Sequence, residues 1–337
     1  MSNKKVTSME VAKLAGVSQS AVSRVFTPGA SSSEKTNKLV RKAATKLGYR
    51  PNILARSLIT GRSRIIGLVV AYLDNYFYPE ALELLSSALQ KKGYHVLIFM
   101  SGNKEGDIAD AVDEILDYQV DGIIAASVSM SSDLAKRCKS AGVPVVLFNR
   151  TQDDKRLSAV TSDNELGGQK VASFLLAGGH KRIGYIAGWE GASTQRDREK
   201  GFTEELKRNG HKLYSREVGN FNSDEARQAA RKMFSGKDFP DAVFIANDAM
   251  AIAVIDVIRF EIGLKVPEEV SVVGYDDVPI SSWPAYDLTT VRQPANRMVA
   301  ETVSILIESI ENKTTTARRI EIDGPLMVRG SARISER

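Results

Sequence analysis

The sequence contains a single cysteine, Cys138, and only three histidines among its 337 residues. One cysteine forms no internal disulfide and no cysteine-cluster metal site, which is typical of a protein in a reducing cytoplasm. The histidines, His95, His180 and His211, are scattered and indicate neither a metal triad nor a Ser/His/Asp set. We therefore expect no metal, no cofactor and no catalytic residue.

Long apolar runs are also missing. No stretch approaches the ~18 apolar residues that a membrane span requires, and the first ten residues have no apolar segment typical of a secretory signal. The sequence therefore predicts a cytoplasmic protein with no membrane partner. The phosphate-loop, dinucleotide, zinc-protease and serine-hydrolase motifs are absent too. Gly178-Gly179-His180 lacks the context of a phosphate loop and is interpreted as the end of a helix.

The positive charge is concentrated at one end of the chain. The net charge is +5, but residues 1–64 hold 13 lysines and arginines against two acids, a local charge of +11. The remaining 273 residues hold 33 basic and 39 acidic side chains, a charge of −6. This asymmetry predicts a polyanion-binding end attached to an acidic globular body. At about 150 residues per domain, the length predicts roughly two domains or a little more.

Residues 8–25 have the pattern of two short helices. Apolar side chains recur at helical spacing in both halves. These side chains are Val11, Leu14, Ala15, Val22 and Val25. Gly16 suits a tight turn, and Ser18 suits the N-cap of a second helix. A helix-turn-helix places its second helix in the major groove of DNA.

The second helix would project Gln19, Ser20 and Arg24 outward. Glutamine can pair with adenine through two hydrogen bonds, and arginine can do so with guanine. We therefore expect these three residues to contact bases. A small helical hairpin with a solvated polar face is the alternative interpretation, but it leaves the +11 charge unexplained.

A third helix is predicted over residues 34–47, followed by a short helix or plain linker over 51–61. Leu39, Val40, Ala43, Ala44 and Leu47 form the apolar stripe of the third helix. Asn52 could cap the shorter segment and Gly61 could end it. A helix of about two turns is marginal in water, so this one would form only against a partner.

Several runs in this region closely resemble the lactose/galactose repressor (LacI/GalR) family. They are Val11-Ala12-Lys13-Leu14-Ala15-Gly16-Val17-Ser18, Val22-Ser23-Arg24-Val25, Leu47-Gly48-Tyr49-Arg50-Pro51-Asn52 and Ala55-Arg56-Ser57-Leu58. The resemblance implies a hinge helix that folds only on operator DNA. Leu58 matches the leucine that each subunit of a dimer inserts into the minor groove, and Ala55 and Arg56 match its neighbours. Glu10 and Ser33 depart from the family pattern, which has Asp and Val at these positions.

From Arg64 onward, short β-branched runs alternate with helical patterns. Strands are expected over 65–70, 95–99, 122–125, 145–148, 183–187, 242–246 and 270–275. Helices are expected over 79–92, 108–118, 132–141, 163–177, 194–208, 224–234 and 249–262. The alternation predicts two doubly wound parallel sheets, with a cleft between two lobes.

Polar residues follow the predicted strands at the edge where α/β proteins bind ligands. Asn149, Asn247 and Asp276 are expected to bind a polyhydroxylated ligand there. For Asp163 and Asp248 we favour a helix-capping role.

The body also resembles the effector domain of the LacI/GalR family, which has a periplasmic-binding-protein-like fold. The matching runs are Phe148-Asn149-Arg150, Ser162-Asp163-Asn164, Arg198-Glu199-Lys200-Gly201-Phe202, Ala246-Asn247-Asp248 and Val272-Val273-Gly274-Tyr275-Asp276-Asp277. The resemblance implies that Arg198 grips an effector and that Asn149, Asn247 and Asp276 bind its hydroxyl groups. Phe77 and Phe221 match aromatic cleft residues, and Gln293 is a weaker match. Trp283 is either a stacking residue or a core residue.

By the same likeness, the headpiece spans 1–50, the hinge 51–61 and the effector domain 62–337. The N-lobe would be 62–161 plus 292–322, and the C-lobe 162–291 plus 323–337. The resemblance implies a homodimeric, ligand-responsive repressor of double-stranded operator DNA. A sugar is the family's usual effector, whereas Arg150, Arg196 and Arg198 near the cleft would favour a sugar acid. The alternative is that Arg150 and Arg196 pair with nearby acids such as Asp197 or Asp153. The competing interpretations are a cytoplasmic enzyme fused to a DNA-binding module and a periplasmic solute-binding protein.

Overall fold

The computed structural model describes residues 6–27, 30–50, 62–71, 73–101, 105–128, 131–152, 155–312 and 316–334. The chain divides into two compact units, Met1–Ser63 and Arg64–Arg337, here called the headpiece and the body. The expected hinge at 51–61, with Ala55, Arg56 and Leu58, lies outside the described residues. No helix in the described ranges is long and apolar enough to cross a membrane.

The headpiece contains three capped helices, α1 (Ser8–Ala15), α2 (Gln19–Val25) and α3 (Glu34–Leu47). Thr7 and Glu10 form a reciprocal capping box at the start of α1, so the departure at Glu10 has a structural use. Ser18 caps α2 and Ser33 caps α3, which explains the second departure from the family pattern. Gly16 ends α1 in the left-handed region, with φ 65°.

The core of the headpiece differs from the sequence prediction at two leucines. Leu14 and Leu39 were expected to point inward, but 45% and 43% of their surfaces are exposed. Ala43 and Ala44 lie in the core as predicted, together with Ala12. These small side chains allow the three short helices to approach closely, while Leu14 and Leu39 remain largely outside the core.

The N-lobe of the body is built on a six-stranded sheet in the order β11-β5-β4-β3-β1-β2, and all its neighbouring strands are parallel. Its strands are β1 (Ile65–Val70), β2 (His95–Met100), β3 (Gly122–Ala126), β4 (Val145–Phe148), β5 (Ser158–Ser162) and β11 (Arg319–Ile322). The helices α5 (Phe77–Lys91) and α12 (Ala295–Asn312) share one hydrophobic cluster with this sheet. The helices α6 (Glu105–Asp117) and α7 (Ser132–Ser140) contribute to a second cluster.

The C-lobe has a sheet in the order β12-β10-β9-β8-β6-β7, in which only the β10–β12 pair is antiparallel. Its strands are β6 (Ile183–Ala187), β7 (Ser215–Val218), β8 (Ala242–Ile245), β9 (Ser271–Asp276), β10 (Thr289–Arg292) and β12 (Leu326–Met327). The flanking helices are α8 (Asn164–Ala177), α9 (Ser193–Arg208), α10 (Ser223–Met233) and α11 (Asp248–Asp256). A π-helical turn, η1 (Val257–Ile262), continues α11, and a 3₁₀ turn, η2 (Pro279–Ser282), follows β9.

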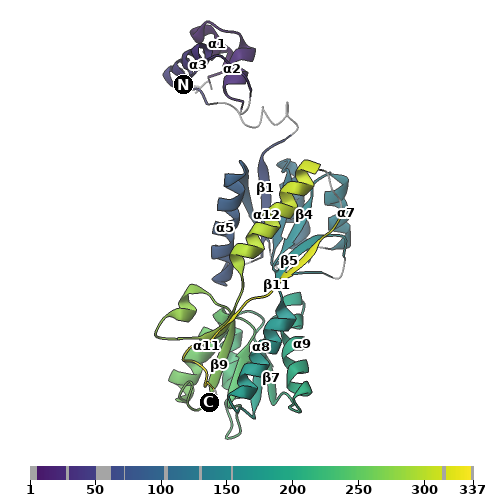
Figure 1. Ribbon diagram of the computed structural model, residues 1–337, viewed down its shortest axis with the longest axis vertical. Coiled ribbons are helices and arrows are strands. Elements are labelled where there is room, and N and C mark those ends of the chain that lie inside the picture. Colours follow the sequence, from purple (N-terminus) through teal and green to yellow (C-terminus); the bar gives the residue numbers. More distant parts are fainter. Residues whose placement is uncertain are drawn as a thin grey trace. The chain divides into compact units, whose positions relative to one another are not determined.

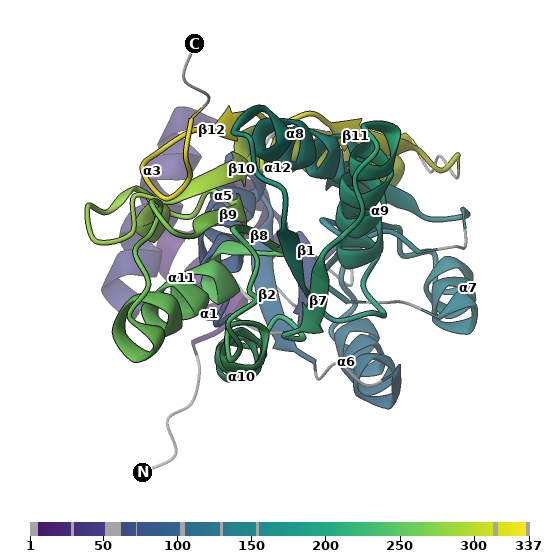
Figure 2. The same ribbon diagram turned by 90° about the horizontal axis from the view of Figure 1, so that it is seen from below.

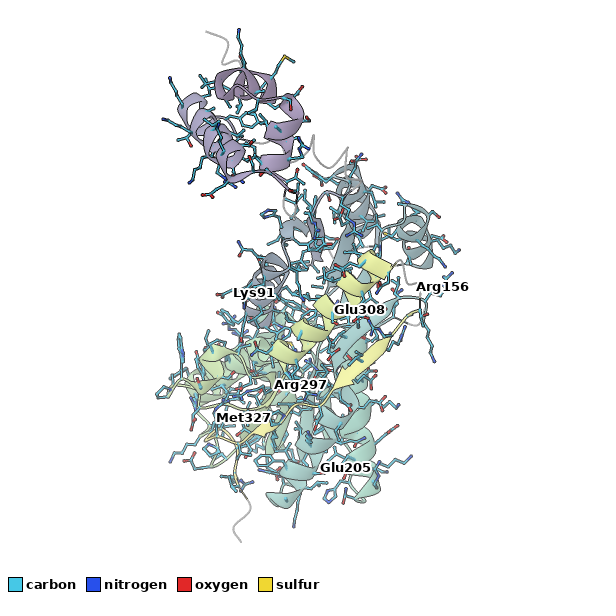
Figure 3. The ribbon with its side chains drawn as sticks, turned by 45° about the horizontal axis from the view of Figure 1, so that its top comes forward. Lys91, Arg156, Glu205, Arg297, Glu308 and Met327 are labelled. Carbon is cyan, nitrogen blue, oxygen red and sulfur yellow. The ribbon has the colours of Figure 1, made fainter. Side chains whose placement is uncertain are left out.

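The chain passes between the lobes more than once, as Figure 1 shows. It leaves the N-lobe after β5, returns to it through α12 and β11, and ends in the C-lobe after β12. In Figure 3, Arg297 and Glu308 lie along the returning helix α12, whereas Glu205 and Met327 lie in the C-lobe. The alternation from 65 to 275 is confirmed, whereas β5, β7, β10, α12, β11 and β12 were not predicted.

Candidate functional site

The expected base-contacting residues lie together on the exposed face of α2. Gln19, Ser20 and Arg24 are all exposed. The Gln19 Nε2 atom donates a hydrogen bond to Ser8 Oγ at 2.9 Å, and the hydroxyls of Ser18 and Ser20 lie 2.9 Å apart. The Gln19 contact holds the start of α2 against the start of α1, and the Ser18–Ser20 contact lies within the start of α2. Arg24, one turn later, projects from the same helix.

The expected effector residues of the C-lobe gather around Arg198, which is 2% exposed. Its Nε atom donates to Asn164 Oδ1 at 2.9 Å, and its Nη1 atom donates to the Ala246 carbonyl at 2.5 Å. Its Nη2 atom lies 3.5 Å from Asp276 Oδ1, and its guanidinium lies 3.6 Å from the ring centroid of Tyr275. Arg198 therefore ties together α8, α9, β8 and β9.

Two glycines allow α8 and α9 to place Arg198 and Asn164 side by side. A Cβ on Gly168 would overlap the backbone of Arg198, and a Cβ on Gly201 would overlap the backbone of Glu165. The two helices therefore pack backbone against backbone at these glycines, and Figure 2 shows α8 and α9 side by side. Any larger side chain at either glycine would separate them.

Asp276 connects the two lobes. Its carboxylate accepts hydrogen bonds from Gln293 Nε2 at 2.7 Å and from Asn75 Nδ2 at 3.2 Å, and Asn75 belongs to the N-lobe. Asp276 and Asp277 have φ angles of 130° and 58°, which are unfavourable for side chains with a Cβ. Burial raises the pKa of Asp276 to about 7, although Arg198 acts in the opposite direction. Such an outlier at the end of a parallel strand is typical of a functional position.

The turn that follows Asp276 is held by its neighbour Asp277 and by Asp248. Asp277 forms ion pairs with Arg292 at 2.6 Å and with Arg329 at 2.5 Å. Asp248 is fully buried and accepts hydrogen bonds from Val278 N, Ser281 Oγ and Thr290 Oγ1. Burial raises the pKa of Asp248.

The capping role expected for Asp248 is therefore wrong, because three donors from later in the chain occupy its carboxylate. Asn247 caps α11 instead, since its Oδ1 atom accepts a hydrogen bond from Met250 N at 3.0 Å. The capping role of Asp163 at α8 is confirmed. The interpretation of Gly178-Gly179 as a helix end is confirmed as well, because α8 ends at Ala177.

The N-lobe contributes Asn149 and Arg150 from the end of β4. Asn149 is 3% exposed, and its Nδ2 atom donates to Tyr78 Oη at 2.8 Å. Arg150 Nη1 donates to the Ser127 carbonyl at 2.7 Å. The Arg150 guanidinium lies 5.6 Å from the ring of Trp189 and 5.9 Å from the ring of Phe221, both in the C-lobe.

The aromatic residues occupy different settings. Phe221 covers Gly188 so closely that a Cβ there would overlap its ring, which places Phe221 at the end of β6. Phe77 lies in the N-lobe core, where its ring stacks on Phe148. Trp283 is 54% exposed, so its interpretation as a core residue is wrong.

Four polar atoms at the inner ends of the strands are buried without a hydrogen-bond partner in the described structure. They are Ser127 Oγ, Asn149 Oδ1, Asn247 Nδ2 and Gln293 Oε1. Native proteins rarely bury such atoms unsatisfied, so each requires an explanation. We call this set, together with Arg150, Arg198 and Asp276, the inter-lobe site. Ser127 was missed because the predicted strand ended at residue 125, whereas the observed strand β3 ends at Ala126 and Ser127 directly follows it. Arg196, which was expected near the cleft, is exposed.

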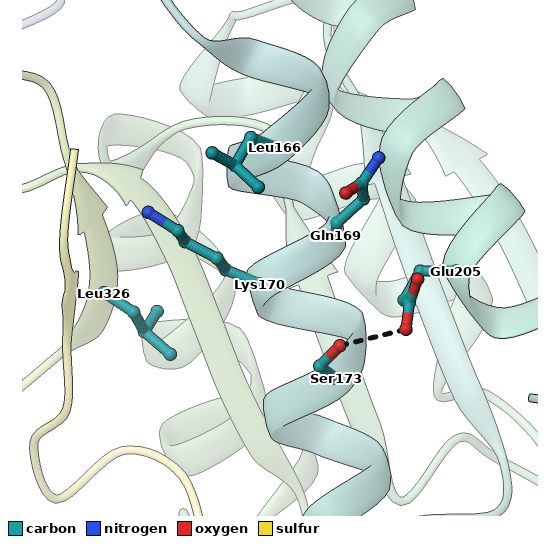
Figure 4. Close-up of a pocket in the computed structure, with 6 residues that line it drawn as sticks. All are labelled: Leu166, Gln169, Lys170, Ser173, Glu205 and Leu326. Atoms are coloured by element: carbon teal, nitrogen blue, oxygen red, sulfur yellow. Dashed lines mark hydrogen bonds between the residues drawn. The ribbon is translucent and has the colours of Figure 1, made fainter. Parts of the chain in front are cut away.

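A second feature is a shallow hollow of about 420 Å³ between α8, α9 and β12 of the C-lobe. It is lined by Leu166, Gln169, Lys170, Ser173, Glu205 and Leu326. In Figure 4, Ser173 of α8 donates to Glu205 of α9, and Lys170 points toward the chain near Leu326. None of the residues expected to bind an effector lines this hollow.

Comparison with known proteins agrees with both parts of the structure. Residues 7–52 match the model of bacterial regulatory proteins of the lacI family, and residues 172–332 match a periplasmic binding protein-like domain. The HTH-type transcriptional repressor PurR of Vibrio vulnificus is 30% identical over 330 residues, which are 97% of this chain and 98% of that one. The chain belongs to the lacI family.

Solved structures of regulators extend the same likeness. The lac repressor dimer bound to operator and the anti-inducer ONPF is 27% identical, with a TM-score of 0.88 over 97% of this chain and 99% of that one. The transcriptional regulator CelR in complex with cellobiose is 30% identical, with a TM-score of 0.73 over 97% of this chain and 100% of that one. The expected fold class and family are therefore confirmed. The protein is a DNA-binding regulator with an effector-binding domain.

Proposed function

We propose that this lacI-family protein is a cytoplasmic repressor that binds a pseudo-palindromic operator as a homodimer. A small sugar or sugar acid at the inter-lobe site controls its affinity for DNA. The protein performs no chemistry on this effector. The headpiece therefore binds DNA, and the body binds the metabolite that controls this binding.

The DNA-binding part of the proposal assigns base contacts to Gln19, Ser20 and Arg24. Their exposure on α2 supports it, because a recognition helix must present polar side chains to the major groove. Leu58 inserts into the minor groove at the centre of the operator, flanked by Ala55 and Arg56, and kinks the duplex there. Lysine and arginine side chains of the headpiece contact phosphates, so affinity falls steeply with salt.

Exposed apolar side chains on the body support dimerisation. The edge strand β2 leaves Ile98 and Met100 about half exposed, at 52% and 53%, and Phe260 of the C-lobe is 81% exposed. Monomeric proteins rarely leave such side chains uncovered at a sheet edge. We expect Ile98→Glu to convert the dimer to a monomer in sedimentation experiments. Tyr214→Glu, at another exposed aromatic residue, is the control and should leave the dimer intact.

The observation that carries the effector part is the set of four buried polar atoms without partners at the inter-lobe site. Two of them accept hydrogen bonds through an amide oxygen, one donates through an amide nitrogen, and the Ser127 hydroxyl does either. Hydroxyl groups of a sugar satisfy all of them. Arg198 and Asp276 bind further hydroxyls, Arg150 and Phe221 close the site, and Phe77 supports it from the core. The likeness to the cellobiose complex of CelR supports a carbohydrate.

Effector binding changes the angle between the lobes and thereby the spacing of the two hinges in the dimer. The inter-lobe hydrogen bonds of Asp276 and Ser193 support this coupling, because a ligand that contacts them changes what joins the lobes. Coupling of this kind amounts to ~1–3 kcal/mol and is reciprocal. An effector that weakens DNA binding tenfold should itself bind tenfold more weakly in the presence of operator.

Selection of duplexes from a random DNA library tests the proposal. We expect the full-length protein to enrich an inverted repeat, and Leu58→Ala to weaken binding to it while leaving effector binding intact. Enrichment of a single, non-repeated site would contradict a dimeric repressor. A compound that raises the thermal midpoint should also be recovered unchanged, since conversion to a product would indicate an enzyme.

A further inference from the structure

The starts of α1 and α2 are both fixed by capping side chains. Thr7 and Glu10 form the capping box of α1, so Ser8 is the first residue of that helix. The side chain of Ser18 caps α2, so Gln19 is the first residue of the second helix. The backbones of Ser8 and Gln19 are therefore held in place independently of any contact that their own side chains make.

The packing of α1 on α2 brings these two first residues together. Val11 of α1 and Val22 of α2 are fully buried in the headpiece core. Across the helix starts, the Gln19 Nε2 atom donates a hydrogen bond to Ser8 Oγ at 2.9 Å. A glutamine side chain on a protein surface otherwise samples many rotamers. A contact that selects one rotamer in advance lowers the entropy cost of fixing this side chain on a target.

The contact with Ser8 leaves part of the Gln19 amide available. A glutamine amide has two N–H donors and one carbonyl oxygen that accepts. Ser8 uses one donor, so within the described headpiece the second N–H and the Oε1 atom remain. In the major groove, adenine presents the acceptor N7 beside the donor N6, whereas guanine presents two acceptors there. The remaining donor and acceptor of Gln19 therefore match adenine with two hydrogen bonds and each other base with one.

We propose that Ser8 is a positioning residue, which orients the Gln19 amide toward an adenine in each half-site of the operator. Ser8 acts through Gln19 and does not contact the base itself. Without the Ser8 hydroxyl, the amide turns its nitrogen or its oxygen outward with less preference and accepts other bases more readily. This inference rests on the proposed base contact of Gln19. It adds a residue of α1, outside the recognition helix, to those that determine sequence specificity.

Binding of the full-length protein to variant duplexes tests the inference. The inverted repeat enriched from a random DNA library is compared with duplexes that carry each of the other base pairs at every half-site position. We expect one position at which the parent protein prefers adenine and at which Gln19→Ala lowers this preference about 10-fold or more. Ser8→Ala should lower the preference at the same position about 3- to 10-fold, because one orienting hydrogen bond is lost. If the position that Gln19→Ala affects prefers another base, the inference is wrong.

Two further variants separate positioning from a purely structural contact between the helices. Ser8→Thr keeps the hydroxyl and should restore most of the preference for adenine. In the Gln19→Ala background, Ser8→Ala should not change the base preference further, because Ser8 acts through Gln19. Hydrogen exchange of headpiece amides should be the same in Ser8→Ala as in the parent protein, since Thr7 caps α1. Weaker binding of Ser8→Ala to every duplex by the same factor, with the base preference unchanged, would show that Ser8 only joins the helices, and would overturn the inference.

Failure of this inference is distinguishable from failure of the proposed function. If Gln19→Ala relaxes one position and Ser8→Ala relaxes none, the base contact of Gln19 stands and the role of Ser8 is wrong. If Gln19→Ala relaxes no position, both the base contact of Gln19 and the role of Ser8 are wrong. Enrichment of an inverted repeat and control by an effector are measured on the parent protein, so they test the dimeric repressor independently of either variant.

Discussion

The headpiece and the body hold the side chains of their proposed sites in opposite settings. Gln19, Ser20 and Arg24 are exposed on one short helix, which suits the proposed contact with a large partner such as DNA. Arg198 and Asp276 are no more than 3% exposed and come from elements distant in sequence, which suits the proposed enclosure of a small effector. We therefore expect replacement of Arg24 to leave the fold intact, whereas Arg198 and Asp276 also hold the body together.

The largest expected effect is at Arg198. Arg198→Met removes one partner of a buried ion pair and leaves Asp276 uncompensated, at a cost on the order of 3–5 kcal/mol in unfolding free energy. Urea unfolding of the body measures this loss, and effector binding should disappear with it. The matched control is Arg227→Ala at the exposed Asp224 ion pair, which should stay within about 0.5 kcal/mol of the parent protein. If Arg198→Met and Arg227→Ala have equal unfolding free energies, the contrast between the buried residues of the body and the exposed ones would be wrong.

At Arg24 the effect should fall on DNA alone. Arg24→Ala should cost about 1–3 kcal/mol at one base position and relax specificity there, with the unfolding of the body unchanged. Binding to duplexes with single base changes measures this effect. Arg24→Lys keeps the charge but loses the paired donors, so it should keep general affinity for DNA while losing discrimination. If both variants bind all duplexes more weakly by the same factor, Arg24 contacts a phosphate and not a base.

The pH dependence of stability should report the burial of Asp276. Its pKa of about 7 in the folded protein exceeds the ordinary value of 3.8, so the folded state binds the proton more tightly. The stabilisation is complete below pH 3.8 and is lost as the pH rises to about 7, with a slope of at most about 1.4 kcal/mol per pH unit. Between pH 5 and 8, Asp276→Asn should remove this slope from urea unfolding curves. Identical slopes in both proteins would contradict the pKa shift.

The smallest expected effect is on the capping box of α1. Thr7→Ala should destabilise the headpiece by about 1 kcal/mol, because it removes the hydroxyl that accepts a hydrogen bond from Glu10 N and donates one to Glu10 Oε2. Hydrogen exchange of headpiece amides in the full-length protein measures it. Thr7→Ser keeps the hydroxyl and serves as the control. Faster hydrogen exchange of body amides in Thr7→Ala would show that the stabilities of the headpiece and the body are not independent.

The two regions also differ in how far the sequence predicted them. The caps at Ser18 and Gly16 and the exposed face of α2 follow from neighbours within one or two turns, so the headpiece was correct except at Leu14 and Leu39. In the body, the rule that ligands bind at the ends of parallel strands selected Asn149, Asn247 and Asp276, which lie at the ends of β4, β8 and β9; their role in binding an effector stays a prediction. The same rule did not distinguish the cap Asn247 from its neighbour Asp248, whose partners lie 30 to 42 residues later.

The sequence by itself determined the charged headpiece, its helix-turn-helix, the alternation of strands and helices, and the family. These are local patterns of charge, spacing and capping, which need no knowledge of distant contacts. Only the tertiary structure decided which polar atoms are buried without partners, and that Arg150 meets Trp189 and Phe221 across the lobes. It also decided that Asp276 lies between Arg198 and Asn75. Burial and pairing depend on residues up to about 200 positions apart, because chain crossings between the lobes bring them together.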